Sequence, residues 1–285
     1  MKINRTLKQA SPQINRKNWT ILGLGLLCAT SRVAAQTSYT ITTTTADAFL
    51  ASGSAGNPHG SDLTGLNFGG AGTLAIAPAS SPDGEFDSII KFNVAGAVSQ
   101  FNTSYGAGNW TITGVTLSLA SNFGVQGAQP NNNIFNTINA GSFGINWLSY
   151  DGWTEGAGSG NGEAGYPATS EVSFNSIPTL LSGAHDSLGT FIYTPPGNNI
   201  YLNYTLPLDA GLVNDAAGGG DVSLYFYAAD NQVSYLFNAR SYASNHPEMT
   251  LRASPVPEPG VAALMGSSLL SLMAWRRRKN AGRGA

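Results

Sequence analysis

The sequence predicts an all-β fold, an antiparallel β-sandwich or jelly roll, followed by a separate short transmembrane helix near the C-terminal end. Three observations lead to this class. Short runs of alternating apolar and polar residues recur along residues 36–254. Segments rich in Gly, Asn and Pro separate these runs, and helical patterns are scarce between them. Many short strands joined by such turns are typical of antiparallel sandwiches.

Residues 1–35 precede this body and resemble a secretory signal peptide. Cations are frequent in the first 17 residues, and the apolar run Trp19–Thr30 that follows is too short for a stable anchor. Val33 and Ala35 are the small residues that a signal peptidase reads, so we expect cleavage after Ala35. The single cysteine, Cys28, would leave with the leader, and the mature chain would have no disulfide or thiolate site.

The body, residues 36–254, is long enough for one large β domain. Its strand candidates carry apolar side chains at every second position or many β-branched residues. In chain order they are Ser38–Thr45, Phe86–Val94, Trp110–Ala120, Phe143–Trp147, Asn199–Leu208, Asp221–Asp230, Gln232–Asn238 and Glu248–Ser254. Thr169–Leu181 and Leu208–Ala216 each predict one short helix.

Alternation also predicts which side chains face inward. Ile200, Leu202, Tyr204, Leu206 and Leu208 share one face of their strand, and the even-numbered residues from Val222 to Ala228 share one face of theirs. Ser223, Tyr225 and Tyr227 then face outward.

In Trp110–Ala120 the apolar residues change phase after Ile112, and they resume at Val115. A β-bulge at Thr113–Gly114 would return both sets to one face.

The charges of the chain are segregated. Of 14 Lys and Arg, six lie in residues 1–35 and five in 276–285, which leaves Lys91, Arg240 and Arg252 in the body. The body also holds 15 Asp and Glu, for a formal net charge of −12. This charge excludes nucleic acid as a partner, because its binding depends on cations that neutralise phosphates. It also argues against docking on anionic lipid and favours a soluble, self-repelling domain.

The end of the chain, residues 255–285, differs from the body. Pro257 and Pro259 around Glu258 favour an extended, exposed segment. Residues 260–275 carry no charge and would form roughly 24 Å of helix, short of the roughly 30 Å hydrocarbon core. Four consecutive cations follow: Arg276, Arg277, Arg278 and Lys279. By the positive-inside rule the C-terminus lies in the cytoplasm and the acidic body outside.

These three elements, in this order, resemble the PEP-CTERM sorting signal of Gram-negative bacteria. The resemblance covers about 30 residues, with the motif on Pro257, Glu258 and Pro259. It implies an exosortase, a transpeptidase-like membrane enzyme, as the partner that cleaves the tail. It also implies export through the inner membrane, transient anchoring there by the helix, and final location at the cell surface. A simple C-terminal anchor is the alternative.

The body resembles DNRLRE-type β-sandwich domains at the level of pattern. Trp153, Thr154, Glu155 and Pro247 match, whereas the acidic residue that often follows the arginine near the end is absent after Arg240. Domains of this type occur on bacterial surfaces and beside polysaccharide-active enzymes, and some are classed as carbohydrate-binding. The resemblance implies association with exopolysaccharide.

Candidate binding residues within the body form two groups. Asp83, Glu85 and Asp87 alternate before a strand, so their oxygens are candidate ligands of a structural Ca²⁺ ion, or else form a solvated acidic turn. The second group lies in or beside the Gly-rich segment 152–167, and its aromatic rings are candidates for stacking on sugars: Tyr150, Trp153 and Tyr166. The G-x-G-x-x-G spacing in that segment lacks a flanking strand and helix, so we exclude a dinucleotide site.

Catalytic motifs are absent from the sequence: there is no H-E-x-x-H and no G-x-S-x-G, and we expect neither an enzyme nor a cofactor. The sequence therefore favours a non-enzymatic exported surface or extracellular-matrix protein. A carbohydrate-binding module is the alternative, followed by a polysaccharide-active enzyme of sandwich fold.

Overall fold

The computed structural model describes residues 35–57, 60–122, 141–156, 171–193 and 199–256, and also 268–269 and 271–273. The chain divides between Ala35 and Gln36 into two units, at the position where the sequence predicts cleavage of the leader. The described strands belong to the second unit. It is mostly β, in antiparallel sheets, as the sequence predicts.

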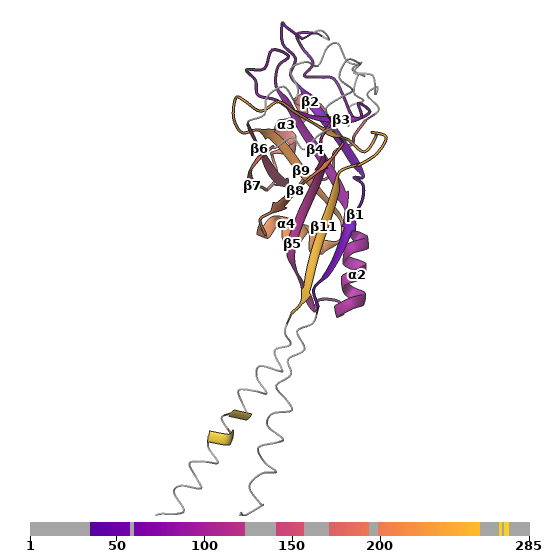
Figure 1. Cartoon of the computed structure of the whole chain (residues 1–285), viewed down its shortest axis with the longest axis vertical. Helices are drawn as coiled ribbons and strands as arrows, with labels where there is room; N and C mark the ends of the chain where they lie inside the picture. The colour runs from indigo at the N-terminus through magenta and orange to yellow at the C-terminus, as the bar shows by residue number, and fades with distance from the viewer. Residues whose placement is uncertain are drawn as a thin grey trace, which may run out of the picture. The chain divides into compact units, whose positions relative to one another are not determined.

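Two larger sheets and one small sheet are formed by the described residues of the body (Figure 1). The four-stranded sheet consists, in spatial order, of β1 (Thr37–Ile41), β11 (Glu248–Pro255), β5 (Trp110–Ala120) and β8 (Tyr201–Leu206). The five-stranded sheet consists of β2 (Ala46–Ala51), β4 (Phe86–Asn93), β9 (Asp221–Ala228), β6 (Ser142–Leu148) and β7 (His185–Ile192). The small sheet pairs β10 (Tyr235–Asn238) with β3 (Thr73–Ile76).

One hydrophobic core contains side chains from both larger sheets. Val115, Leu117, Leu119, Met249 and Leu251 come from the four-stranded sheet, and Ile90, Phe92, Ile145, Leu224 and Phe226 come from the five-stranded sheet. The ring centroid of Phe143 on β6 lies 5.3 Å from that of Tyr204 on β8, so the two sheets meet directly. Because each buried apolar side chain of this size contributes roughly 1.5–3 kcal/mol, the shared core holds the sheets together.

The predicted bulge in β5 is confirmed. Arg252 of β11 pairs with Gly114 and the next residue, Ala253, pairs with Ile112, so Thr113 is the extra residue. Ile112 and Val115 are both buried in the main core as a result.

A second apolar cluster covers the opposite face of the five-stranded sheet. Leu50, Ile89, Leu148 and Tyr225 belong to it from the strands, and Trp153, Val172 and Leu180 from the covering segment. The outward direction of Ser223 and Tyr225 is correct, but both are buried, with exposed fractions of 0% and 5%. Both faces of the central strands are therefore covered by protein.

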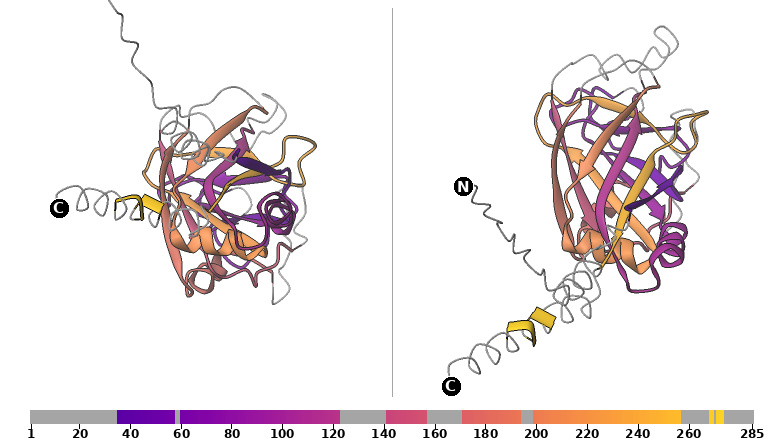
Figure 2. Two further views of the ribbon diagram at one scale, coloured as in Figure 1. Left: turned by 90° about the horizontal axis from the view of Figure 1, so that it is seen from below. Right: turned by 60° about the horizontal axis from the view of Figure 1, so that its bottom comes forward.

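The described helices are short, and one of them has no counterpart in the sequence prediction. The predicted helical segments appear as α4 (Ala210–Gly218) and as the 3₁₀ turn Phe174–Ser176 with α3 (Ile177–Leu180). Asp209 caps α4, because its carboxylate accepts bonds from the backbone N–H groups of Gly211 and Leu212. The helix α2 (Ala95–Tyr105) was not predicted. In Figures 1 and 2, α2 (magenta) and α4 (orange) lie at the same end of the sheets.

Three strands were also missed, and one inward face was assigned in part wrongly. β2, β3 and β7 lie outside the predicted strands. Ile200 and Leu208 are 47% and 49% exposed, because β8 ends at Leu206 and begins at Tyr201. Of the predicted membrane helix 260–275, only 268–269 and 271–273 are described, and they are helical. No helix among the described residues is both long enough and apolar enough to cross a membrane.

Candidate functional site

The C-terminal attachment of the body is the first candidate site. β11 extends to Pro255, and the backbone N–H of Val256 donates to the backbone oxygen of Asn109 at 2.9 Å. Pro257 follows at once, so no linker separates the fold from the predicted sorting motif. Pro257, Glu258 and Pro259, and the cations Arg276, Arg277, Arg278 and Lys279, lie outside the described residues.

The N-terminal attachment lies beside it. Thr37 of β1 pairs with Ala253 of β11, because the two strands are antiparallel. The side-chain nitrogen of Gln36 donates to the hydroxyl of Thr113 at 2.5 Å, one residue after the predicted cleavage position at Ala35. The beginning and the end of the body therefore leave the fold at the same end of the four-stranded sheet.

A buried cation organises the outer face of the five-stranded sheet. Lys91 is 7% exposed, and its Nζ donates to the backbone oxygens of Asp151 and Trp153 at 2.7 and 2.8 Å. The same nitrogen lies 4.5 Å from the centroid of the Trp153 ring. The indole N–H of Trp153 donates to Ser223 at 2.9 Å, and Ser223 donates to Asp151 at 2.5 Å. Lys91 thus fixes the start of the segment that covers the sheet.

Partial burial and neighbouring charges both shift the pKa values of Lys91 and Asp151. Burial lowers the pKa of Lys91, while the carboxylates of Asp221 and Asp151 act in the opposite direction. Burial raises the pKa of Asp151, and the bond from Ser223 and the charge of Lys91 oppose that rise. The sequence offered one signal for this site: Lys91 is a cation within a predicted strand and faces away from Ile90 and Phe92.

The three aromatic candidates for sugar stacking are in different environments. Trp153 is only 4% exposed, beneath Lys91 and against the second apolar cluster. This burial is at odds with its predicted role, because stacking on a sugar needs a free ring face. Tyr150 is 37% exposed, beside Gly152, and keeps an accessible ring. Tyr166 lies outside the described residues.

The base of the Gly-rich segment is tied to the body by polar contacts that the sequence did not predict. The Arg240 Nε donates to Glu155 at 2.7 Å, and the Arg240 backbone N–H donates to buried Asp47 at 2.8 Å. The Asn67 side chain donates to the backbone oxygens of Glu155 and Val172, which flank the segment 157–170 outside the described residues. Arg240 therefore has an acidic partner, Glu155, at a distance of 85 residues along the chain.

The predicted calcium ligands lie where β4 begins. Asp87 is 2% exposed and accepts a hydrogen bond from the Tyr225 hydroxyl. Burial raises the pKa of Asp87 to about 7, and the charge of Glu85 adds to that rise. Burial also raises the pKa of Glu85, and Asp83 is 9% exposed. Among the described residues, no group of three or more His, Cys, Asp or Glu side chains is arranged to hold a metal, so the Ca²⁺ site stays a prediction.

Comparison with known proteins assigns the end of the chain. Residues 255–279 match the family described as the PEP-CTERM protein-sorting motif. No curated protein matches the chain. The matched range begins at Pro255, the last residue of β11, and ends at Lys279. The chain thus carries a PEP-CTERM protein-sorting motif, and this motif implies an exported protein that an exosortase sorts.

Proposed function

We propose that this protein is a non-enzymatic surface or extracellular-matrix protein that an exosortase releases from the inner membrane and that associates with exopolysaccharide. The observation that carries the proposal is the sorting motif at residues 255–279, which directly follows the last strand of the folded body. The body has the charge expected of an exported, soluble cargo, with 15 acidic and three basic residues. The tail is then a temporary anchor, and the body is what reaches the surface.

The arrangement of the sheets supports a β-sandwich as the body of this cargo. Side chains of the four-stranded and the five-stranded sheet fill one core, and the rings of Phe143 and Tyr204 meet across it. Two antiparallel sheets whose side chains fill one core between them are the arrangement that a β-sandwich requires. The absence of a cysteine from residues 36–254 means that this core has to supply the stability of the domain.

The test of the sorting proposal replaces parts of the tail and follows the precursor in the native cell. Pro257→Ala with Pro259→Ala, or replacement of all four cations at 276–279 by Gln, should leave the protein unprocessed, because the enzyme loses its motif or the helix loses its stop. Intact mass of the protein from the membrane and from the surface measures the outcome. A variant with Ser254→Ala serves as a control within the body and should be processed normally.

Processing and surface location at the wild-type rate in both tail variants would refute exosortase-dependent sorting. Full-length precursor that stays in the membrane of wild-type cells would support the simple anchor instead.

Carbohydrate binding by the body is the second candidate function, and the exposed Tyr150 ring favours it. The Tyr150 ring is 37% exposed and rests against Gly152, so a flat aromatic face with its own hydroxyl is accessible at the rim of the Gly-rich segment. Aromatic rings beside hydrogen-bonding groups are the usual elements of sugar recognition. Binding of the processed protein to exopolysaccharide from its own cell should weaken on Tyr150→Ala if this candidate is correct.

A further inference from the structure

Both ends of the body emerge at one edge, and α2 lies against that edge. The hydroxyl of Tyr105, the last residue of α2, bonds to Thr37 at 2.7 Å and to the backbone oxygen of Ala253 at 3.2 Å. The indole N–H of Trp110 donates to the Asn102 side chain at 2.8 Å, and Trp110 pairs with Pro255. The C-terminal end of α2 and the turn 106–109 therefore lie beside the point where the tail begins. The surface formed by α2, this turn and the C-terminal turn of α4 is here called the α2 end.

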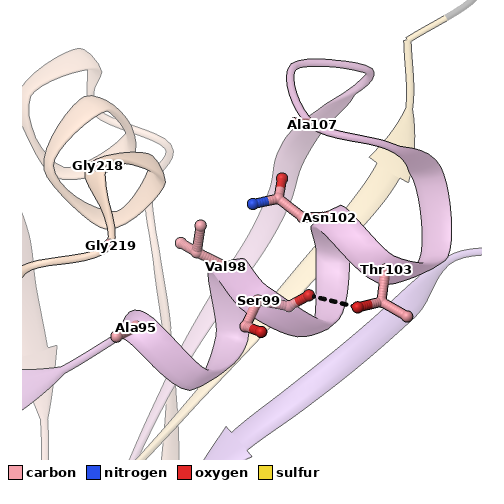
Figure 3. Close-up of a pocket in the computed structure, with 8 residues that line it drawn as sticks. All are labelled: Ala95, Val98, Ser99, Asn102, Thr103, Ala107, Gly218 and Gly219. Atoms are coloured by element: carbon pink, nitrogen blue, oxygen red, sulfur yellow. Dashed lines mark hydrogen bonds between the residues drawn. The ribbon is translucent and has the colours of Figure 1, made fainter.

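A groove crosses the α2 end between α2 and the turn after α4 (Figure 3). Val98 points toward Gly218 and Gly219, and Ser99, Asn102, Thr103 and Ala107 also line the groove. Gly219 adopts φ +79° as the C-cap of α4, and a Cβ built there would lie 3.4 Å from Val98. Because the walls are small or flexible side chains, a partner's backbone can approach closely.

The α2 end is uncharged where the tail leaves it. Residues 95–109 and 216–220 contain no Asp, Glu, Lys or Arg, although the body as a whole has a formal net charge of −12. The charged side chains closest in sequence to the groove residues Gly218 and Gly219 are Asp215 and Asp221. Asp215 accepts a hydrogen bond from the Trp147 indole, and Asp221 accepts one from the Asn93 side chain, each at 2.9 Å. A surface of this kind lacks the cations that would hold anionic phospholipid headgroups. It fits a neutral protein partner instead.

The stretch of chain between the last described residue of the body, Val256, and the uncharged stretch of the tail is short. From Val256 to Gly260, where the uncharged stretch of the tail begins, four residues span at most roughly 14 Å. An enzyme in the membrane that holds Pro257–Pro259 must therefore approach the α2 end closely. We propose that the α2 end is a docking surface for the sorting enzyme, and that the groove receives an uncharged loop of that enzyme. This inference rests on the sorting function proposed above.

The test places single charges of either sign in and beside the groove of the full-length chain. Ser99→Lys and Ser99→Glu should each slow processing by about tenfold, because a charge of either sign would be desolvated against an uncharged loop. Pulse-labelling of native cells, followed by the ratio of precursor to processed protein, measures the rate. Lys and Glu are both good helix formers, so either substitution preserves α2. Limited proteolysis of the membrane-bound precursor verifies that the body of each variant is folded.

Two matched pairs serve as controls. Ser104 is exposed on the same helix but does not line the groove, and Ala243 is exposed in the loop before β11, at the far end of that strand. Lys or Glu at either position should change the processing rate by less than about twofold.

Each other outcome contradicts docking in the groove. Wild-type rates for both Ser99 variants, or equal slowing by the Ser104 variants, would overturn it. Slower processing with Glu and faster processing with Lys would show a membrane field in place of an enzyme contact. The Pro257→Ala, Pro259→Ala variant in the same experiment separates the two proposals: if it is blocked while the Ser99 variants are normal, sorting stands and docking fails.

Discussion

At the residue scale, Lys91 shows how a charge is accommodated inside this protein. Two carbonyl oxygens and the face of Trp153 surround its ammonium group. A hydrogen bond to a charged group contributes about 1.5–3 kcal/mol, and a desolvated cation–π contact about 2 kcal/mol. The cost of removing the ammonium group from water is several kcal/mol, so the two hydrogen bonds and the ring contact are all needed to offset it. Lys91 therefore helps to hold Trp153 in place. Because two of its contacts are backbone oxygens of Asp151 and Trp153, they exist only while this segment packs on the sheet.

Asp87 is the opposite case, because its surroundings favour the neutral form. It is 2% exposed, its Oδ1 has no hydrogen-bond partner among the described residues, and its pKa is raised from 3.8 to about 7. Between these two values the folded protein binds a proton that the unfolded chain has lost. Stability contributed by the protonated carboxyl is therefore complete below about pH 4 and is lost as the pH rises to about 7.

This loss of stability with rising pH leads to a prediction for Asp87. Asp87→Asn should stabilise the processed protein at pH 8 by on the order of 2 kcal/mol and leave stability near pH 4 almost unchanged, because the amide stays neutral and still accepts from Tyr225. Urea unfolding at pH 4, 6 and 8 measures the effect. Asp62→Asn is the control, since hydrogen bonds from Thr64 lower the pKa of Asp62 and the sign reverses. An unchanged pH dependence in Asp87→Asn would contradict the assignment.

At the element scale, alternation predicted those features that one strand determines by itself. The phase change between Ile112 and Val115 identified the bulge, because period-2 facing fails there unless one residue is inserted. The inward direction of Val222, Leu224 and Phe226 on β9 was correct for the same reason. The cap of α4 by Asp209 is also a local signal, but the sequence prediction began this helix at Leu208 and named no cap.

Features that depend on distant segments were not predictable. β2 is buried on both faces, so its sequence does not alternate, and α2 buries only Ala97 and Phe101 and has a weak helical pattern. The glycan prediction treated Trp153 as a loop aromatic, whereas Lys91, 62 residues earlier, holds it in the core. The Glu155–Arg240 pair also joins residues far apart in the chain. Neither contact follows from spacing in one sequence.

The covering segment that begins at Asp151 supports an element-scale prediction. Trp153→Ala should destabilise the processed protein by about 3–5 kcal/mol, because it removes a buried indole and leaves Lys91 without its ring. Tyr150→Ala is the matched control: with 37% exposure, it should cost less than about 1.5 kcal/mol.

Thermal unfolding and binding to exopolysaccharide, measured on both variants, distinguish structure from recognition. We expect Tyr150→Ala to change binding and Trp153→Ala to change stability. A stable Trp153→Ala variant with lost binding would restore Trp153 as a sugar-contacting ring and contradict the structural role.

At the scale of the whole molecule, the antiparallel pair β1–β11 brings the first and the last strand of the body side by side. If the leader and the tail enter the same membrane, as the proposed sorting requires, a body whose two ends leave at the same edge can fold beside that membrane without a long linker. The pairing of Thr37 with Ala253 provides this arrangement. The same pair brings α2 and its groove next to the tail. The pairing of β1 with β11 therefore places α2 beside the segment at which the exosortase is proposed to act.

A linker between the body and the tail tests this connection directly. Insertion of five or 15 Gly/Ser residues between Val256 and Pro257 should slow processing progressively, by several-fold at 15 residues, whose end-to-end distance is roughly 22 Å. The reason is that docking of the α2 end raises the local concentration of the motif at the enzyme, and a longer tether dilutes it. The processing rate in pulse-labelled cells is the measurement.

The combination of the linker with Ser99→Glu supplies the decisive comparison. If the groove and the motif bind the enzyme as one unit, Ser99→Glu should slow the wild-type chain about tenfold and the 15-residue linker variant much less, because the linker has already uncoupled the two contacts. Equal slowing in both backgrounds would mean that the charge acts elsewhere. Processing that becomes faster with linker length would mean that the folded body obstructs the enzyme. Docking of the body by its α2 end requires two results together. The processing rate must fall as the linker lengthens, and the effect of Ser99→Glu on that rate must become smaller with the longer linker.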